Sequence, residues 1–186
     1  MRIISGTLGG RVIPSPPSND TRPTTDAARE MLFSVLDTWI TWNGLRVLDL
    51  CAGTGSLGFE AISRGAASVV FVDRSKPCIK TIEETIRDFG VSDHATTIHS
   101  DVLEALRYPL HNKSFDVVFA DPPYHAKLHN KITLLLERNG ILVTDGIYIA
   151  EHGENEALIL DEGWEKLDHR RRGPAVIDII RRVTKP

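Results

Sequence analysis

Three aspartates, Asp49, Asp73 and Asp121, lie at the ends of strand-like apolar runs, and a glycine-rich turn follows the first of them. In an open parallel sheet, ligands bind outside the carboxyl ends of the strands. We therefore expect these three acids to meet at one edge of a sheet. Gly53 and Gly55 have no Cβ atoms, which allows a sharp turn and lets a ligand lie against the backbone. The sequence predicts a nucleotide-type cofactor site beside this turn.

The glycine spacing also fits a dinucleotide cofactor. Gly53, Gly55 and Gly58 spell G-x-G-x-x-G after an apolar run, and Asp73 follows 20 residues after Gly53. This spacing is typical of a dinucleotide-binding fold, although a lone glycine pattern is weak evidence. A nicotinamide-dependent oxidoreductase is therefore one alternative, and other motifs must decide between the cofactors.

The second informative motif is Asp121-Pro122-Pro123-Tyr124, which follows the apolar run Phe115–Ala120. Two prolines hold the backbone extended and donate no hydrogen bonds, so the carbonyls there can face a ligand. Asp121 and the Pro122 carbonyl can accept the two hydrogens of an exocyclic amine, while Tyr124 stacks on a planar base. We expect these four residues, including Pro123, to form the catalytic site of an enzyme that acts on a nucleobase.

Alternating strand and helix patterns position these motifs. The strand-like runs are Arg46–Leu50, Ser68–Val72, Ala95–His99, Phe115–Ala120 and Gly146–Glu151, and the helical patterns between them are Ser56–Arg64, Pro77–Phe89, Val102–Tyr108 and Leu128–Arg138. Such alternation implies right-handed crossovers and a parallel sheet. Trp164–Arg172 and Ala175–Val183 add an antiparallel pair. The predicted fold is Rossmann-like α/β, with a seven-stranded, mostly parallel sheet, helices on both faces and a C-terminal antiparallel hairpin.

An appendage precedes this domain. Arg2–Ser5 and Arg11–Ile13 should pair as a β-hairpin, and the polar, proline-rich residues from 14 to 23 form an arm. A helix follows, with a buried stripe expected at Ala28, Met31, Leu32, Val35, Leu36 and Trp39. We therefore divide the chain into an N-terminal hairpin and arm, residues 1–23, and one domain, residues 24–186.

Composition narrows the class of protein. The chain has 186 residues, 41% of them hydrophobic, which suits one well-cored domain. Cys51 and Cys78 form no C-x-x-C, and neither a signal peptide nor a membrane span is predicted. These features indicate a cytoplasmic protein, and we expect a monomer. The net charge is −3, but the acidic residues 145–168 precede a basic end, residues 169–186, which suits a phosphate-binding face or an ordinary solvated surface.

The motifs together resemble a known family. D-x-x-x-G-x-G at Asp49–Gly55 with D-P-P-Y at Asp121–Tyr124 resembles S-adenosylmethionine-dependent amino-group methyltransferases. The opening is similar to RsmD-type 16S ribosomal RNA guanine-N2 methyltransferases at Arg2–Gly6, Gly10-Arg11, Arg22–Asp26 and Arg29-Glu30, and the similarity runs from Met1 to roughly Glu151. Members of the family usually have a basic residue followed by Tyr-Gly ahead of the last strand. This sequence has Arg171-Arg172-Gly173 at that place. The aromatic contribution of that hairpin is thereby put in question.

The resemblance implies a class I methyltransferase that methylates the N2 amine of a guanine in small-subunit (16S) ribosomal RNA, alone or in an assembling subunit. It implies that S-adenosylmethionine is bound by Asp49, Ala52, Gly53, Gly55, Asp73, Arg74, Asp101 and Val102. Asp49 would lie near the ammonium, Asp73 would take the ribose hydroxyls and Asp101 would take the adenine amine. Each acid could instead cap the turn or helix after it. The RNA phosphates would be bound by Arg2, Arg11, Arg22 and Arg29.

Other classes of protein remain to be tested. A DNA adenine or cytosine amino-methyltransferase would share the D-P-P-Y motif, and a non-catalytic RNA-binding module would share the basic arm. Pro77-Cys78 resembles the motif of cytosine-C5 methylases but follows the second strand rather than the fourth. His125 and His129 are four residues apart, which could suit zinc, but a solvated start to the following helix is the favoured interpretation. We expect no metal.

Overall fold

The computed structural model describes residues 1–14 and 26–185. It contains two compact units, Met1–His99 and Ser100–Pro186. The expected boundary between residues 23 and 24 lies outside the described residues and stays a prediction. No helix in the described part of the chain is both long and apolar enough to span a membrane.

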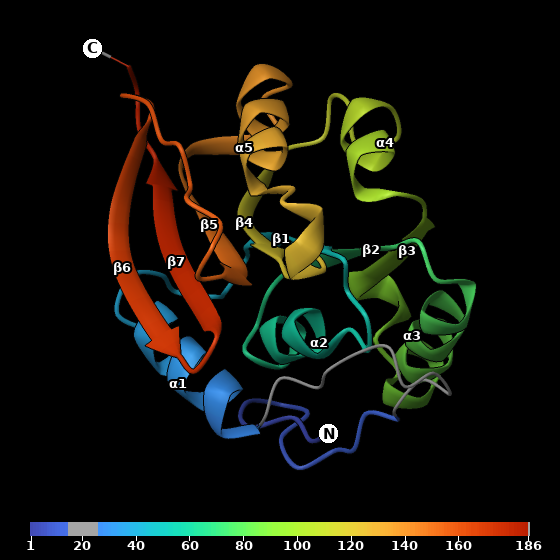
Figure 1. The fold of residues 1–186 in the computed structure, drawn as a ribbon. Helices are drawn as coiled ribbons and strands as arrows, with labels where there is room; N and C mark the ends of the chain where they lie inside the picture. Colours follow the sequence, from blue (N-terminus) through green and yellow to red (C-terminus); the bar gives the residue numbers. More distant parts are fainter. Residues whose placement is uncertain (15–25, 186) are drawn as a thin grey trace. The chain divides into compact units, whose positions relative to one another are not determined.

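The first unit is a three-stranded parallel sheet with its crossover helices. Its elements are α1 (Asp26–Leu36), β1 (Arg46–Leu50), α2 (Ser56–Ser63), β2 (Ser68–Asp73), α3 (Lys76–Phe89), the 3₁₀ turn η1 (Ser92–His94) and β3 (Ala95–His99). The strand order is β3-β2-β1, and Asp49 pairs in register with Phe71. Figure 1 shows α2 and α3 on the same side of these strands. Parallel pairing places the carboxyl ends of β1 and β2 side by side.

Local sequence explains where α3 begins and ends. The Ser75 side chain accepts a hydrogen bond from the Cys78 N–H, and Pro77 occupies the first turn, where no donor is needed. Gly90 ends the helix with φ of 69°, a left-handed conformation that glycine adopts without strain. Isoleucines on one face, among them Ile82 and Ile86, bury the helix against the sheet. The helix therefore follows directly from the end of β2, where Asp73 lies.

The second unit contains the remaining elements. They are α4 (Val102–Arg107), β4 (Phe115–Ala120), η2 (Tyr124–Ala126), α5 (His129–Arg138), β5 (Leu142–Gly153), β6 (Trp164–Arg172) and β7 (Ala175–Arg182). The strand order is β4-β5-β7-β6, in which β4 and β5 are parallel and the other pairs are antiparallel. Figure 1 shows α4 and α5 next to each other and the long β6–β7 hairpin. The expected C-terminal hairpin is confirmed.

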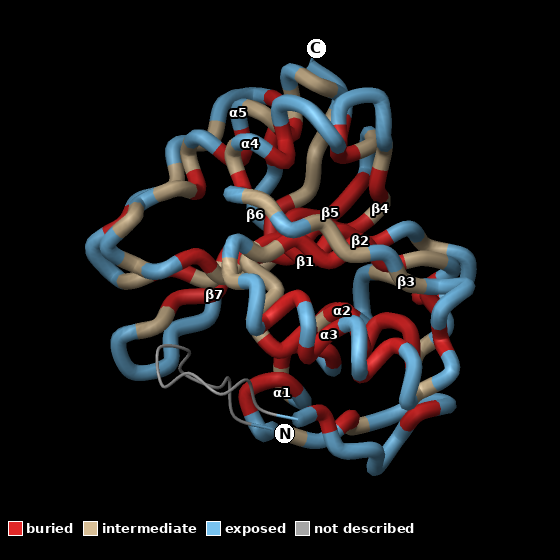
Figure 2. Tube along the Cα trace, turned by 90° about the vertical axis from the view of Figure 1, so that its right-hand side faces the viewer, coloured by how far each residue is buried: buried red, intermediate tan, exposed pale blue. Residues whose placement is uncertain are grey.

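The central strands are buried on both faces. Val47, Leu48 and Leu50 in β1 have no exposed surface, and four successive residues of β4, Val117–Ala120, are at most 2% exposed. Figure 2 shows the buried residues along these strands and the exposed residues on loops and outer helix faces. Continuous apolar runs of this kind are typical of parallel strands covered on both sides. This burial agrees with the mostly parallel sheet that the alternating strand and helix patterns predict.

Some expected elements differ in extent or burial. β5 begins at Leu142 rather than Gly146, because Leu142 already pairs with Phe115 of β4 and the strand continues through an irregularity near Asp145, whose φ is 63°. Trp39 lies beyond α1 and is 45% exposed, so its predicted burial is wrong. Trp42 is buried instead and stacks on Phe33 of α1, with ring centroids 5.1 Å apart.

The N-terminal hairpin packs on α2. Its two arms are joined by an antiparallel bridge between Arg2 and Val12. Glu60 of α2 is fully buried and accepts hydrogen bonds from the backbone N–H groups of Ile4 (2.7 Å) and Ser5 (3.1 Å). These contacts tie the opening residues of the chain to the helix that follows the glycine turn.

The tip of the hairpin is tied to the end of the same helix. The Ser63 carbonyl accepts from the Thr7 N–H (2.8 Å), and the Ser63 hydroxyl accepts from the Leu8 N–H (2.9 Å). Gly6 has φ of 83°, and a Cβ there would lie 1.9 Å from the Ser63 carbonyl oxygen. Only glycine fits at this contact. The predicted hairpin is therefore present and anchored.

Candidate functional site

The turn after β1 is built by glycines in left-handed conformations. Gly53 has φ of 57° and Gly55 has φ of 75°, and the Ala52 carbonyl accepts the Gly55 N–H (2.7 Å). A Cβ at Gly53 would approach only the Cys51 carbonyl oxygen, at 4.0 Å, so space beside the turn is open. A Cβ at Gly58 would lie 2.3 Å from the Phe71 ring of β2. Gly53 and Gly55 thus form the expected tight turn, and Gly58 allows α2 to pack closely on β2.

Asp73 braces the glycine turn from the end of β2. Its carboxylate accepts the Gly53 N–H (2.8 Å) and the Ser75 N–H (2.7 Å). Ser75, rather than Asp73, caps α3. Arg74 follows and is exposed, with its carbonyl bonded to His99 at the end of β3 (3.0 Å). The structure thus brings Asp73 to the turn, where an adjoining ligand would meet its oxygens.

Asp49 lies beneath the same turn. Only 2% of it is exposed, and its carboxyl accepts the Gly58 N–H (3.0 Å). Burial and the nearby charge of Asp73 raise the pKa of Asp49 to about 8. The side chain is therefore mostly protonated at neutral pH in the free protein, although a cation placed beside it would favour the ionised form.

Asp101 and Val102 lie where the second unit begins. The Asp101 side chain caps α4 by accepting the Leu103 N–H (2.9 Å), and Asp101 itself is exposed. Val102 is the first residue of α4 and is buried. The capping alternative is therefore seen, and binding of adenine by Asp101 and Val102 stays a prediction.

The D-P-P-Y motif forms a turn between β4 and η2. Asp121 follows the last residue of β4 and is partly exposed, and Pro122 is buried. The Pro123 carbonyl accepts the Ala126 N–H (2.8 Å), so it is already engaged within the turn. Tyr124 opens η2 and is partly exposed. The acceptors assigned to an amine substrate are therefore the Asp121 carboxylate and the Pro122 carbonyl.

Three residues from α5 and β5 support this turn and were not predicted from sequence. The Tyr124 hydroxyl donates to Glu151 Oε1 (3.2 Å), and a Cβ at Gly153 would lie 3.3 Å from Tyr124 Cβ. His129 Nε2 bonds the Glu151 carbonyl (2.9 Å). One of these residues could have been predicted from sequence. Glu151 ends an expected apolar strand, as the three aspartates do, so it could have been placed at the same edge of the sheet.

Two of the predicted RNA-binding arginines lie on the N-terminal hairpin. Arg2 and Arg11 are both exposed. The Arg11 guanidinium lies 5.3 Å from the centroid of the Phe89 ring and donates to the Phe89 carbonyl (3.1 Å). A planar guanidinium held in this way can still present donors to a phosphate. The structure leaves both arginines at the surface, and Arg22 lies outside the described residues.

Arg29 corrects one expectation. Its side chain is fully buried, where it donates to the Arg2 carbonyl and to Asp26 Oδ1 (3.0 Å). Arg29 lies three, four and seven residues before Leu32, Phe33 and Leu36, so it shares the buried face of α1. A side chain held there cannot reach a phosphate at the surface. We therefore assign Arg29 to anchoring the hairpin rather than to RNA.

The sequence also suggested other reactive groups, which lie in unsuitable surroundings. Cys78 is 2% exposed, and burial raises the pKa of its thiol, which disfavours the reactive thiolate. His129 is buried rather than solvated as predicted, and burial lowers its pKa to about 4. Across residues 1–14 and 26–185, no three His, Cys, Asp or Glu side chains gather in a way that could hold a metal ion.

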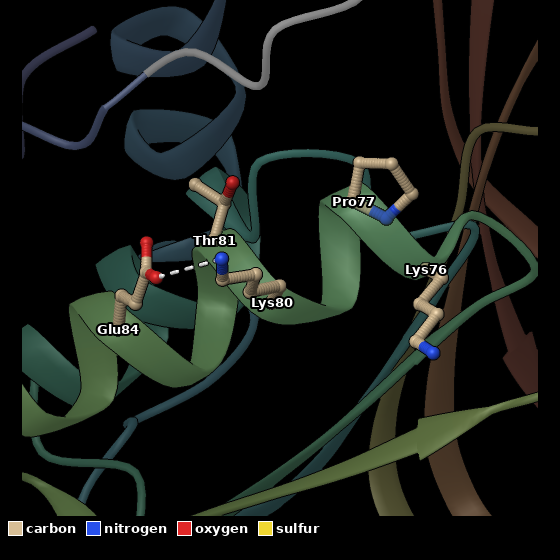
Figure 3. Close-up of a pocket in the computed structure, with 5 residues that line it drawn as sticks. All are labelled: Lys76, Pro77, Lys80, Thr81 and Glu84. Carbon is tan, nitrogen blue, oxygen red and sulfur yellow. Dashed lines mark ion pairs between the residues drawn. The ribbon is translucent and has the colours of Figure 1, made fainter.

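Two further surface features are formed by α3 and by the β6–β7 turn. Lys76, Pro77, Lys80, Thr81 and Glu84 of α3 line a pocket (Figure 3). Lys80 pairs with Glu84 across it (3.8 Å). At the β6–β7 turn, Arg171 pairs with Glu154, and Gly173 has φ of 58°.

Solved structures place this architecture in a known class. The chain superimposes on the yhhF protein of Escherichia coli with a TM-score of 0.88, at 28% identity over 98% of each chain. A Haemophilus influenzae protein gives a TM-score of 0.83 at 31% identity, again over 98% of each chain. A seven-stranded, mostly parallel sheet with a C-terminal antiparallel hairpin defines the Rossmann-like class I methyltransferase fold. The predicted fold class is confirmed.

Sequence comparison then gives the family. The model described as "Conserved hypothetical protein 95" matches residues 1–181. "Ribosomal RNA small subunit methyltransferase D" of Haemophilus influenzae is 35% identical over 174 residues, which cover 93% of this chain and 89% of the relative. The protein of that name from Escherichia coli K12 is 32% identical over 165 residues, or 88% and 81%. The chain belongs to this RsmD family, as the motifs predicted.

Proposed function

We propose that this protein transfers a methyl group from S-adenosylmethionine to the exocyclic N2 amine of a guanine in small-subunit ribosomal RNA. The observation that carries the proposal is the Asp121–Tyr124 turn at the end of β4, in a chain that belongs to the RsmD family. Relatives at 32–35% identity are named as ribosomal RNA small subunit methyltransferases, which supports the RNA substrate. The N2 position is our inference from the acceptor chemistry of the turn.

The first unit supplies the groups that suit the cofactor. S-adenosylmethionine carries a sulfonium methyl, an ammonium and a ribose, and when bound it supplies the methyl group. Open space beside Gly53 fits a ligand against the backbone. The Asp73 carboxylate accepts two hydrogen bonds from the turn. Because a carboxylate has about four acceptor sites, it could also accept hydrogen bonds from two ribose hydroxyls. Ala52 and Gly55 would line the methionine and ribose portion, and Arg74, Asp101 and Val102 would contact the adenine.

The second unit supplies the groups that act on the amine. The lone pair of a guanine amine is delocalised into the ring and is a weak nucleophile. Asp121 and the Pro122 carbonyl would accept the two amine hydrogens and favour tetrahedral geometry, while Tyr124 stacks on the base. Positioning and preorganised electrostatics would supply most of the acceleration. The proton would leave afterwards, to water or through Asp121, and no metal is invoked.

The RNA phosphates would be bound by the exposed Arg2 and Arg11, with Arg22 added from the arm. We infer that the base is extruded into the site, because its amine cannot be reached inside a stacked helix. The proposed partner is small-subunit ribosomal RNA or an assembling small subunit. We further propose that the protein is a cytoplasmic monomer, which ultracentrifugation of the purified protein would test.

One assay tests the function. Purified protein with radiolabelled S-adenosylmethionine is added to free small-subunit RNA and to particles from cells that lack the activity, and the RNA is then digested to nucleosides. We expect the label in N2-methylguanosine. Label in N6-methyladenosine or N4-methylcytidine would instead support an amino-methyltransferase of another base. Matched DNA oligonucleotides test the DNA alternative in parallel.

Cofactor binding is expected to release a proton from Asp49. Because its pKa is raised to about 8, Asp49 is mostly protonated at pH 7 until an ammonium approaches and favours the carboxylate. Binding coupled to proton release strengthens as pH rises and levels off above the free pKa, so affinity should rise between about pH 6 and 8. Calorimetry at pH 7 in buffers of different ionisation enthalpy measures the protons released.

The control for this experiment is Asp49→Asn, which keeps an oxygen for the Gly58 N–H but cannot titrate. Any protons exchanged by the ligand's own ammonium are the same for both proteins. The difference in protons released between wild type and variant is therefore the contribution of Asp49. Equal proton release by wild type and variant would contradict contact between Asp49 and the ammonium.

Loss of Arg11 is expected to flatten the salt dependence of RNA binding. Each lost phosphate contact lowers the slope of log affinity against log salt by about 0.7–0.9. Arg11→Gln should therefore lower the slope by nearly one unit, measured by filter binding across a salt series. Lys113→Gln, an exposed lysine of the second unit, is the matched control. An unchanged slope would move the RNA contact elsewhere, first to Arg170–Arg172.

A further inference from the structure

We propose that Glu151 is a positioning residue that fixes the ring of Tyr124 in the orientation needed to stack on the target base. This inference rests on the proposed function, because it takes Tyr124 as the stacking residue. It assigns a role to a carboxylate of β5 that does not contact the reacting amine in the mechanism above. Contacts within the second unit carry the argument.

The Tyr124 ring is fixed at both of its ends. The backbone of η2 holds Cβ, and the hydroxyl at the far end donates to Glu151 Oε1 at 3.2 Å. With both ends held, the χ1 torsion of Tyr124 is fixed and the ring is kept in one position. The hydroxyl oxygen lies on the χ2 axis, so this bond acts on the plane of the ring only through the preference of the phenol O–H to lie in that plane.

Gly153 supports the side of the same ring. A Cβ there would lie 3.3 Å from Tyr124 Cβ, 3.4 Å from Cδ2 and 3.5 Å from Cγ. The backbone of Gly153 is not in a conformation that requires glycine, because its φ is not positive. The absence of a side chain at this position is therefore explained by the close approach of Tyr124. The two residues that restrain the ring, Glu151 and Gly153, both lie at the end of β5.

The backbone of Glu151 is itself held from two sides. Glu151 pairs in register with Ile177 of β7, and its carbonyl accepts a hydrogen bond from His129 Nε2 (2.9 Å). A carbonyl only accepts, so Nε2 carries the hydrogen and Nδ1 of a neutral ring is the acceptor. Nδ1 lies 2.6 Å from the Tyr148 hydroxyl, which donates to it. Burial lowers the pKa of His129 to about 4 and keeps this arrangement over the neutral range.

The chain of contacts runs from Tyr148 through His129 to the Glu151 backbone, and from the Glu151 side chain to Tyr124. In this arrangement the Tyr124 hydroxyl orients the ring and takes no part in the chemistry. Removing either partner of the Tyr124–Glu151 bond should have the same effect, and removing both should have no further effect. A double-mutant cycle measures this property directly.

The cycle uses Tyr124→Phe, Glu151→Ala and the double variant, with Glu151→Gln as the conservative control that keeps an acceptor oxygen. Single-turnover rates are measured at saturating RNA and cofactor. We expect each of the first two changes to slow methyl transfer about two- to fivefold, with no further loss in the double variant, and Glu151→Gln to stay close to wild type. Cofactor affinity should not change. Additive losses, or full activity of Glu151→Ala, would overturn the proposal.

A second readout requires no activity. The chain has three tyrosines, so ring-labelled tyrosine gives a simple NMR spectrum that Tyr124→Phe assigns. Glu151→Ala should shift and narrow the Tyr124 signal as its ring gains mobility, while exposed Tyr108 is unchanged. An unaltered Tyr124 signal would sink the proposal. Gly153→Ala is an independent test of the same contact. It should slow methyl transfer when introduced alone, and it should cause no further loss when introduced into the Tyr124→Ala variant.

These readouts separate the inference from the function on which it rests. If wild type methylates a base other than guanine, the proposed function fails, and the cycle is scored on the product formed. If wild type forms N2-methylguanosine and the cycle is additive, the positioning role fails alone. If no RNA is methylated, the tyrosine spectrum still decides whether Glu151 holds the ring.

Discussion

Asp121→Asn is expected to reduce methyl transfer about 10²- to 10³-fold, the range found when one preorganised electrostatic contact to a reacting group is lost. The variant keeps the shape of the side chain but replaces an anionic acceptor with an amide that can present N–H to the guanine amine. Single-turnover assays at saturating RNA and cofactor measure the loss. Cofactor affinity, measured by calorimetry, should change little.

Tyr124 provides the matched comparison at the neighbouring position. Tyr124→Phe keeps the stacking face and should lose only the about two- to fivefold expected from the hydroxyl, whereas Tyr124→Ala loses stacking of about 1–3 kcal/mol per base. The expected order of rates is wild type, then Phe, with Ala and Asp121→Asn far below. A fully active Asp121→Asn would show that the acceptor lies elsewhere. If Tyr124→Phe were as slow as Tyr124→Ala, the hydroxyl rather than the ring would be the working group.

Asp73→Ala is expected to weaken S-adenosylmethionine binding by about one to two orders of magnitude, because loss of a charged acceptor for hydroxyl groups typically costs about 1.5–3 kcal/mol. The side chain also holds the Gly53 and Ser75 N–H groups, so some of this loss would come from a looser turn. Asp73→Asn separates the two effects, since its amide oxygen still accepts one backbone bond. Calorimetry measures the affinity for the cofactor, and thermal unfolding measures how much stability is lost when the turn is loosened.

The cofactor class is tested with the same proteins. Wild type should bind S-adenosylmethionine and its demethylated product, S-adenosylhomocysteine, and should not bind NADH. The glycine spacing and Asp73 alone do not distinguish these ligands, because both classes of cofactor place a ribose near the end of the second strand. Tight NADH binding would favour the oxidoreductase alternative and contradict the methyltransferase proposal.

Local patterns predicted most of the fold. The bounds of β1, β3, β4 and β6 match the expected ranges, and in β1 and β4 a mostly apolar, buried run leaves little freedom in where the strand lies. β5 was predicted too short, since Asp145-Gly146 reads as a turn while the chain there continues as an irregular strand. Trp39 was placed in a buried stripe that α1 does not reach.

The residues of the candidate site that could be predicted from sequence are those whose position is determined by the end of a single strand or by a single turn. Asp49 and Asp73 come together because parallel strands end side by side, which the order of elements already implies. Glu151 and Gly153 support Tyr124 from 27 or more residues away, and such a contact has no local signature. Arg29 was assigned to RNA binding on its positive charge, but its position in the helical repeat places it on the buried face of α1. Its spacing to Leu32 and Leu36 was the better guide.

The anchors of the N-terminal hairpin have a consequence for the order of folding. Its bonds to Glu60 and Ser63 join residues 55 to 58 positions apart, so the hairpin cannot dock until α2 has formed. Contacts of such long range form late, and a hairpin closed by a single bridge opens at lower free energy than the central sheet, although Ile3, Leu8 and Ile13 are buried. Arg2 and Arg11 are therefore carried by the segment most prone to detach. Under mild denaturation we expect the hairpin, with the arginines proposed to bind RNA, to detach while β1 and β2, with Asp49 and Asp73, remain folded.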